Sequence, residues 1–147
     1  MYRAVTRKVE VTVTPHFVPE RSSPGNSYFF WAYTIDITNL GPETVQLKTR
    51  HWRITDALGR LQEVKGPGVV GEEPLLKPGD SFEYTSGVPL PTPSGFMVGS
   101  YGMVTAEGEQ FDIEIRHSRW IRATLSGRLT SRLARQAALA ATERPLW

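Results

Sequence analysis

The sequence predicts an all-β protein: an antiparallel β-sandwich of seven to eight strands, followed by a C-terminal amphipathic helix. Two observations support this prediction. Short segments of alternating apolar and polar residues are separated by turn signals roughly every eight to twelve residues, as is typical of sandwiches. In addition, no helical period occurs before residue 120. The chain has 147 residues and no cysteine, so a hydrophobic core rather than disulfides must hold the fold.

The first expected strands carry their apolar residues on one face. Val9, Val11 and Val13 alternate with polar residues, and we expect Pro15 to end this strand because proline cannot donate to a sheet ladder. The strongest strand pattern runs over residues 27–39. Its large apolar residues share one face, while the other face becomes polar, so we expect burial on both faces only near its beginning.

A hairpin is predicted in the middle of the chain. One strand leads through residues 45–55 into a turn at 56–59, and the return strand covers residues 60–65. The stretch that follows, residues 65–74, is too rich in glycine to pair as an ordinary strand. This stretch therefore separates the two halves of the predicted sandwich.

The second half of the sandwich begins with a turn. A Pro-Gly pair at residues 78–79 predicts a type II turn, and the proline-rich segment 86–93 predicts a break in strand pairing. Strands at residues 96–106 and 111–115 complete the sandwich.

The net charge of +2 conceals two parts of opposite sign. Residues 1–115 contain 10 lysines and arginines against 14 carboxylates, whereas residues 116–147 contain seven arginines against Glu143 alone. A mildly acidic body argues against a nucleic-acid surface there and leaves the C-terminal segment as the basic region. The sequence shows no apolar signal segment and no membrane-spanning run, so we expect a cytoplasmic protein without a membrane partner.

The C-terminal segment predicts one amphipathic helix of about four turns, because apolar residues recur every three or four positions. The stripe consists of Leu125, Leu129, Leu133, Ala137 and Ala140. We therefore divide the chain into a sandwich domain, residues 1–121, and a basic helical extension, residues 122–147. The arginines of the tail and Trp120 could contact nucleic acid, and the leucines could cover a partner. We favour a helix that packs on its own domain.

Gly66, Gly68 and Gly71 match the G-x-G-x-x-G spacing of phosphate-binding loops. A dinucleotide site also needs a helix directly after the loop, with its N-terminus facing the pyrophosphate. No helix is predicted there, Pro67 removes a donor, and Glu72 begins a pair of carboxylates that would repel phosphate. We therefore reject a Rossmann site. An anion-binding nest of backbone amides is one alternative, and a simple turn is the interpretation we favour.

Arg50 or Arg53 could hold an anion at this loop by a bidentate contact, and His51 could supply a donor or a base. Alternation along a strand places Arg50 and Trp52 on one face and His51 and Arg53 on the other, so the four cannot all converge on one ligand. The alternative is a buried tryptophan flanked by solvated charges, and we favour it. The candidate ligand-binding residues are Gly66, Gly68, Gly71, Arg50 and His51.

No residue is predicted to be catalytic or to bind a metal or cofactor. His16, His51 and His117 fall on separate predicted elements and form no pair at metal-ligand spacing. The sequence also lacks a G-x-S-x-G motif and paired carboxylates on one face. We therefore expect a protein that is not an enzyme.

A set of short motifs over residues 9–115 resembles the ApaG family in order and spacing. They include Tyr28-Phe29-Phe30, Arg50-His51-Trp52, Gly66-Pro67-Gly68-Val69-Val70-Gly71-Glu72, Ser86-Gly87 and Met97. The resemblance implies an immunoglobulin-like or fibronectin type III-like sandwich in a bacterial cytoplasmic protein. It also implies an indirect association with cobalt resistance and magnesium efflux. The same domain occurs in animal F-box and DNA-polymerase-associated proteins, where it resembles a protein-binding module.

The leading hypothesis is a non-enzymatic, ApaG-like module that binds a protein partner through loops and an exposed sheet face. The alternative is a sensor of a phosphate-containing small molecule, a nucleotide or dinucleoside polyphosphate, at residues 66–71. A third hypothesis is nucleic-acid binding by the arginine-rich tail. The sequence leaves homo-oligomerisation open.

Overall fold

The computed structural model describes residues 1–121. They form β1 (Tyr2–Thr6), β2 (Val9–Phe17), β3 (Phe29–Asn39), β4 (Val45–Asp56), β5 (Leu61–Pro67), β6 (Leu75–Leu76), β7 (Ser81–Leu90), β8 (Gly95–Thr105) and β9 (Gln110–Trp120). Two short 3-10 helices, η1 (Pro19–Arg21) and η2 (Pro24–Asn26), connect β2 to β3.

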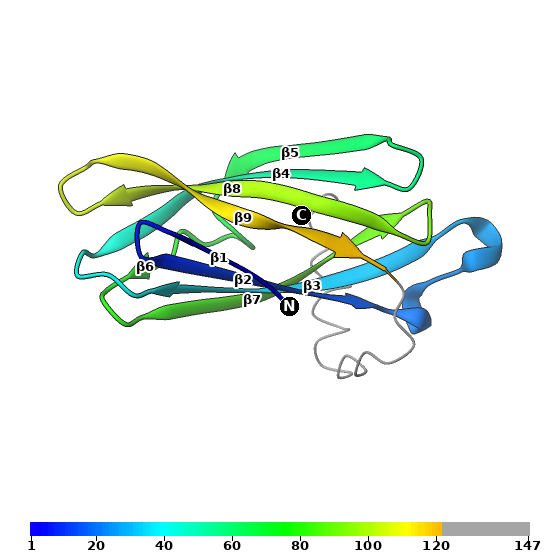
Figure 1. The fold of residues 1–147 in the computed structure, drawn as a ribbon, viewed down its shortest axis with the longest axis horizontal. Coiled ribbons are helices and arrows are strands. Elements are labelled where there is room, and N and C mark those ends of the chain that lie inside the picture. The colour runs from blue at the N-terminus through cyan, green and yellow to red at the C-terminus, as the bar shows by residue number, and fades with distance from the viewer. Residues whose placement is uncertain (122–147) are drawn as a thin grey trace.

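The strands form two antiparallel sheets that pack face to face (Figure 1). The first sheet has the order β1-β2-β3-β7, and the second has the order β5-β4-β8-β9, with β6 paired to β4. The predicted all-β sandwich is therefore confirmed. One side is closed where β1 lies beside β9. There the Tyr2 hydroxyl donates to the Arg119 carbonyl at 3.1 Å, and the Glu114 amide donates to the Thr6 hydroxyl at 3.2 Å.

Aromatic side chains fill the space between the sheets. The ring centroids of Trp31 and Trp120 are 5.8 Å apart, and Tyr33 lies 5.8 Å from Trp120 and 5.5 Å from Trp52. All four residues are at most 2% exposed. The predicted apolar face of β3 is confirmed, and only the first five residues of this strand are buried on both faces. Contacts between rings from both sheets thus hold the sandwich together.

Proline interrupts the strands less than expected. β2 continues through Pro15 and β7 continues through Pro89, so the breaks predicted at these residues are wrong. β1 pairs with β2 only as far as Val13, and β7 is the outer strand of its sheet. An unpaired edge accepts a residue without an N–H group, which is why both prolines are tolerated.

The predicted count of seven to eight strands is too low, because the described residues contain nine. β1 was not predicted, because none of its residues is fully buried and its alternation of apolar and polar residues is weak. It also ends the return strand at Lys65, whereas β5 pairs as far as Pro67. The last strand, β9, runs past Ile115 to Trp120. Trp120 is fully buried, which agrees with its assignment to the sandwich domain and argues against the alternative that its ring contacts nucleic acid.

The predicted C-terminal amphipathic helix lies outside the described residues, and so does the extension at residues 122–147. Both stay predictions. Within residues 1–121, no helix has the length and hydrophobicity that crossing a membrane requires.

Candidate functional site

The glycine-rich stretch closes in a tight turn. Val69 and Glu72 exchange two backbone hydrogen bonds, each 2.8 Å long, around Val70 and Gly71. The φ angles of these two central residues are +43° and +84°, which is typical of a type I′ turn. A β-branched residue adopts positive φ only at an energetic cost, so the neighbouring structure must hold Val70 in this conformation.

Other backbone groups of the stretch are also engaged. The Gly68 amide donates to the Lys48 carbonyl at 2.9 Å, and Gly68 has a φ of +60°. A Cβ atom on this glycine would lie 2.4 Å from the carbonyl oxygen of Glu72. The amides of Gly68, Val69 and Glu72 thus donate to carbonyls of the protein itself and not into an open nest. This geometry favours the turn interpretation, and phosphate binding at residues 66–71 stays a prediction.

Arg50 lies on the inner face of its sheet and holds the turn through the backbone. Its Nη1 atom donates to the carbonyl of Pro67 at 2.7 Å and to that of Gly68 at 3.0 Å. Gly66 pairs with Arg50 across the strands, and a Cβ atom there would lie 3.1 Å from the guanidinium. The structure therefore brings Arg50, Gly66 and Gly68 together, with the arginine positioning the turn.

Three buried tyrosines lie near Arg50 inside the sandwich. Burial raises the pKa of Tyr33 to about 12 and raises the pKa values of Tyr84 and Tyr101 well above their ordinary range, while the positive charge of Arg50 partly offsets these shifts. The hydroxyl groups of Tyr84 and Tyr101 hydrogen-bond to each other. These groups are protonated at neutral pH and form part of the core.

His51 projects from the outer face of the same strand. Its Nε2 atom lies 2.9 Å from Oε2 of Glu63. The hydrogen bond with His51 is the largest effect that lowers the pKa of Glu63, and the charges of Lys65 and Arg53 add to it. The structure therefore separates His51 from Arg50, so the five predicted ligand-binding residues do not form one site.

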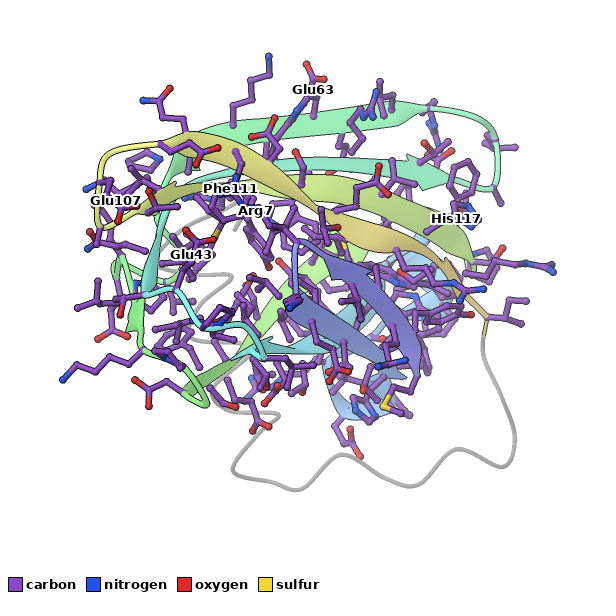
Figure 2. All side chains as sticks on the ribbon, turned by 60° about the vertical axis from the view of Figure 1, so that its left-hand side comes forward. Arg7, Glu43, Glu63, Glu107, Phe111 and His117 are labelled. Carbon is purple, nitrogen blue, oxygen red and sulfur yellow. The ribbon has the colours of Figure 1, made fainter. Side chains whose placement is uncertain are left out.

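Basic and apolar side chains gather on this outer face of the second sheet. The register places Arg53 of β4 opposite Val98 of β8, and Phe96 of β8 opposite Arg119 of β9. Figure 2 shows His117 of β9 on the side of the sheet that faces away from the first sheet. We define the arginine face as Arg53, Phe96, Val98, Arg116, His117 and Arg119.

A β-bulge in β9 places two consecutive residues on the arginine face. Opposite a single residue of β8, β9 contains both Arg116 and His117. Both are exposed, although consecutive residues of a regular strand face opposite sides. Alternation resumes after the bulge, with Ser118 and Trp120 buried and Arg119 exposed. The bulge thus adds one side chain to the outer face without moving the aromatic residue that anchors the strand.

An aromatic pair lies within the arginine face. The rings of Phe96 and His117 have centroids 5.0 Å apart and an interplanar angle of 49°. Phe96 is 39% exposed, a large fraction for a phenylalanine. Beside the pair is an open hollow of about 440 Å³, whose lining includes Ala4 of β1, His51 and Glu114.

Within residues 1–121, Arg116 and Arg119 form no ion pair, and Arg53 lies opposite Glu63, whose pKa its charge helps to lower, without a close ion pair. None of the ion pairs within residues 1–121 involves Arg53, Arg116 or Arg119. A guanidinium offers five donors in a fixed planar arrangement and is weakly hydrated, so it binds carboxylates readily. The arginine face therefore combines accessible cations with an exposed aromatic surface.

A second charged cluster, at one end of the sandwich, is paired internally. Arg7 donates to both carboxylate oxygens of Glu109 at 2.8 Å and to Glu43 at 3.4 Å, and its guanidinium lies 4.6 Å from the centre of the Phe111 ring (Figure 2). The hydrogen bond with Glu109 raises the pKa of Arg7 and lowers that of the glutamate. These contacts join the β1–β2 turn to the β8–β9 turn, so we assign this cluster to stability.

Most of the arginine face is not predicted from the sequence. Arg53 is considered there as a possible anion contact at the glycine loop and as a charge beside Trp52, and residues 116–119 are assigned to the approach to a helix. A signal is nevertheless present, because the apolar alternation that ends at Ile115 resumes at Ser118 and Trp120 with one extra residue between. A period of two that slips by one residue is typical of a bulge.

The fold and the face define a class of protein: a two-sheet β-sandwich with an exposed basic surface on one sheet. A model of the ApaG domain matches residues 19–105. The ApaG proteins of Bradyrhizobium diazoefficiens and Rhodospirillum centenum are 70% and 64% identical to this chain over 115 residues, which are 78% of this chain and 88% of each relative. The chain belongs to the ApaG family.

Solved structures agree with this assignment. A crystal structure of a Bordetella pertussis protein described as ApaA is 48% identical, with a TM-score of 0.78, covering 79% of this chain and 94% of that chain. A second structure, solved by X-ray in a structural genomics programme, is 42% identical with a TM-score of 0.76, covering 86% of this chain and 96% of the other. The predicted family and the predicted sandwich are both confirmed.

Proposed function

We propose that this protein is a non-enzymatic module of the bacterial cytoplasm that binds a protein partner through the arginine face. The observation that carries the proposal is the arrangement of this face, where three arginines that form no close ion pair with any residue of 1–121 surround the exposed Phe96–His117 pair. Strands fix the backbone of these residues, so no loop has to become ordered when a partner binds. An open sheet surface suits a macromolecule better than a small substrate, which is usually enclosed in a pocket.

Outside the arginine face, acidic and basic side chains that could act in catalysis are already hydrogen-bonded within the protein, which supports a binding function over an enzymatic one. His51 is hydrogen-bonded to Glu63. Burial alone would raise the pKa of Asp56, but hydrogen bonds from Arg60 and Leu58 outweigh it and lower the pKa. A general acid or base at neutral pH needs a pKa shifted towards 7, whereas these carboxylates are shifted away from it. Reproducible turnover that depends on any of these groups would overturn the non-enzymatic part of the proposal.

We propose further that the association with cobalt resistance and magnesium efflux is indirect and acts through the partner. Carboxylates that could attract a divalent cation already bind cations of the protein: Glu109 and Glu43 contact Arg7, and Glu73 contacts Lys48. Titration calorimetry of the full chain with Mg²⁺ and Co²⁺ should give no binding heat beyond dilution. A stoichiometric site for either metal would contradict an indirect role.

In-cell photo-crosslinking tests the partner directly. A benzoylphenylalanine replaces Phe96, where an aromatic ring is already exposed, and in a matched control it replaces Leu40, which is 56% exposed and lies outside the arginine face. We expect a discrete protein adduct from position 96 in cells that naturally make the protein. The adduct should be lost when Arg116→Glu is added, and position 40 should not give it.

The proposal fails if position 96 gives no adduct, or if both positions give the same set of adducts. Circular dichroism of each variant controls for folding, since both replaced side chains are exposed and a native spectrum is expected.

A further inference from the structure

We infer that the arginine face recognises an acidic, extended segment of the partner, in which carboxylates flank an aromatic side chain. This inference rests on the proposed function and specifies the chemistry of the partner. It assigns the carboxylates to Arg53, Arg116 and Arg119 and the aromatic side chain to the Phe96–His117 pair.

The spacing of the cations fits an extended peptide. Because of the bulge, Arg116 and Arg119 share the outer face and lie opposite Val98 and Phe96 of β8, which are two residues or roughly 7 Å apart along the strand. Arg53 and Arg116 lie on either side of β8, two strand spacings or roughly 10 Å apart. In an extended segment, carboxylates two residues apart point to the same face and are separated by roughly 7 Å. One such segment can therefore reach two of the arginines at once.

The centre of the face selects for an aromatic or large apolar side chain. Phe96 exposes 39% of its surface and forms a tilted pair with His117, leaving ring surface open to a further ring. Each carboxylate that binds a neighbouring arginine loses water as the aromatic side chain covers the centre. Hydrogen bonds in such a partly desolvated site are stronger than in water, so the two contacts support each other.

The charge pattern favours a peptide over a nucleic acid. Glu63 and Glu114 lie on the same outer face of the sheet, on either side of the arginines. A phosphate backbone carries charge continuously and would meet these carboxylates. Discrete carboxylates on a peptide can bind the arginines while its neutral residues pass the glutamates.

Fluorescence anisotropy with the full chain tests the inference. The probe is a labelled peptide in which one tyrosine is flanked on each side by glutamates. Matched probes replace the glutamates by glutamines or the tyrosine by alanine, and an oligothymidylate represents nucleic acid. The variants are Arg116→Glu combined with Arg119→Glu, and Lys77→Glu as a control that changes an exposed lysine in the turn between β6 and β7.

We expect the glutamate–tyrosine peptide to bind more tightly than every other probe. Binding should weaken at least about tenfold in the double variant and with added salt, and it should be unchanged in Lys77→Glu. A peptide with lysines in place of glutamates should bind the double variant better than the natural protein, because this exchange restores opposite charges.

Equal or tighter binding of oligothymidylate that the double variant weakens would overturn the inference, and so would peptide binding that charge reversal leaves unchanged. Absence of peptide binding would overturn it as well. If the peptide fails while the Phe96 crosslink still forms and depends on Arg116, the acidic segment is refuted and the protein-binding module stands. If the crosslink from position 96 is also absent, the proposed protein-binding function is refuted as well.

Discussion

Replacing Trp120 by alanine should destabilise the sandwich strongly, although this residue stands at the edge of the arginine-rich tail in the sequence. Its ring is fully buried and stacks on Trp31 and Tyr33 of the opposite sheet, with both centroid distances at 5.8 Å. Its indole N–H donates to the Ser118 hydroxyl at 3.0 Å. The side chain is therefore the last anchor of β9, and it fixes the strand that carries Arg116 and Arg119.

The expected loss follows from the buried area. A fully buried tryptophan removes about 200 Å² from water, which at about 25 cal/mol per Å² is about 5 kcal/mol. The retained Cβ reduces this value, while the cavity left between the two sheets adds to it. We expect Trp120→Ala to lower the free energy of unfolding by about 4 kcal/mol. An exposed tail residue would change it by less than about 0.5 kcal/mol.

Urea unfolding followed by far-UV circular dichroism measures this difference, because fluorescence would report the loss of the tryptophan itself. Arg119→Ala is the matched control, since its side chain is exposed and adjacent in sequence. The control should unfold at nearly the same urea concentration as the natural protein, with the same slope. If Trp120→Ala behaves like this control, β9 does not extend to Trp120 and the arginine face is not formed as described.

The turns and the buried tyrosines provide further tests. Gly68→Ala should destabilise more than Gly59→Ala in urea unfolding. Both glycines have positive φ, at a shared cost of about 1–2 kcal/mol, but only the Cβ added at Gly68 meets a backbone oxygen. Arg7→Ala should reduce the loss of the free energy of unfolding that acid causes in the natural protein. Because Arg7 lowers the pKa of Glu109 in the folded state, this stabilisation is present above pH 4.5 and is lost as the pH falls through the folded-state pKa. Raising the pH above 10 should unfold the protein cooperatively in an absorbance titration. The pKa of about 12 for Tyr33 exceeds its unfolded value of 10.0, so the folded state loses stability as the pH rises from 10 to 12. Titration of Tyr33, Tyr84 and Tyr101 near pH 10 without unfolding would contradict the burial of these three side chains.

Most of the fold could be predicted from the sequence because a half-buried strand repeats every two residues. The alternation in β3 identifies the core face, which contains Trp31 and Tyr33. Proline misled the prediction, since Pro15 and Pro89 lie where strands have a free edge, and edges depend on pairing between distant segments. The sequence around one residue does not show whether its strand lies at an edge.

The candidate site could be predicted from the sequence less well than the fold. The spacing of Gly66, Gly68 and Gly71 suggested a ligand, whereas the structure uses these glycines for close backbone approach and a type I′ turn. Arg50 was correctly placed on the face of Trp52, but its contacts with the turn depend on the pairing of β4 with β5. The arginine face depends on a bulge and on residues from three strands, so no local motif contains it.

Mapping the bound peptide on the protein by NMR tests the central claim most directly. Amide shifts of the isotope-labelled full chain are recorded while the glutamate–tyrosine peptide is added. We predict that the largest shift changes fall on Arg53, residues 96–98 and residues 116–119, and that residues 66–71 stay unchanged. Changes centred on residues 66–71 or on residues 122–147, with the arginine face unaffected, would contradict the claim that this face is the binding surface.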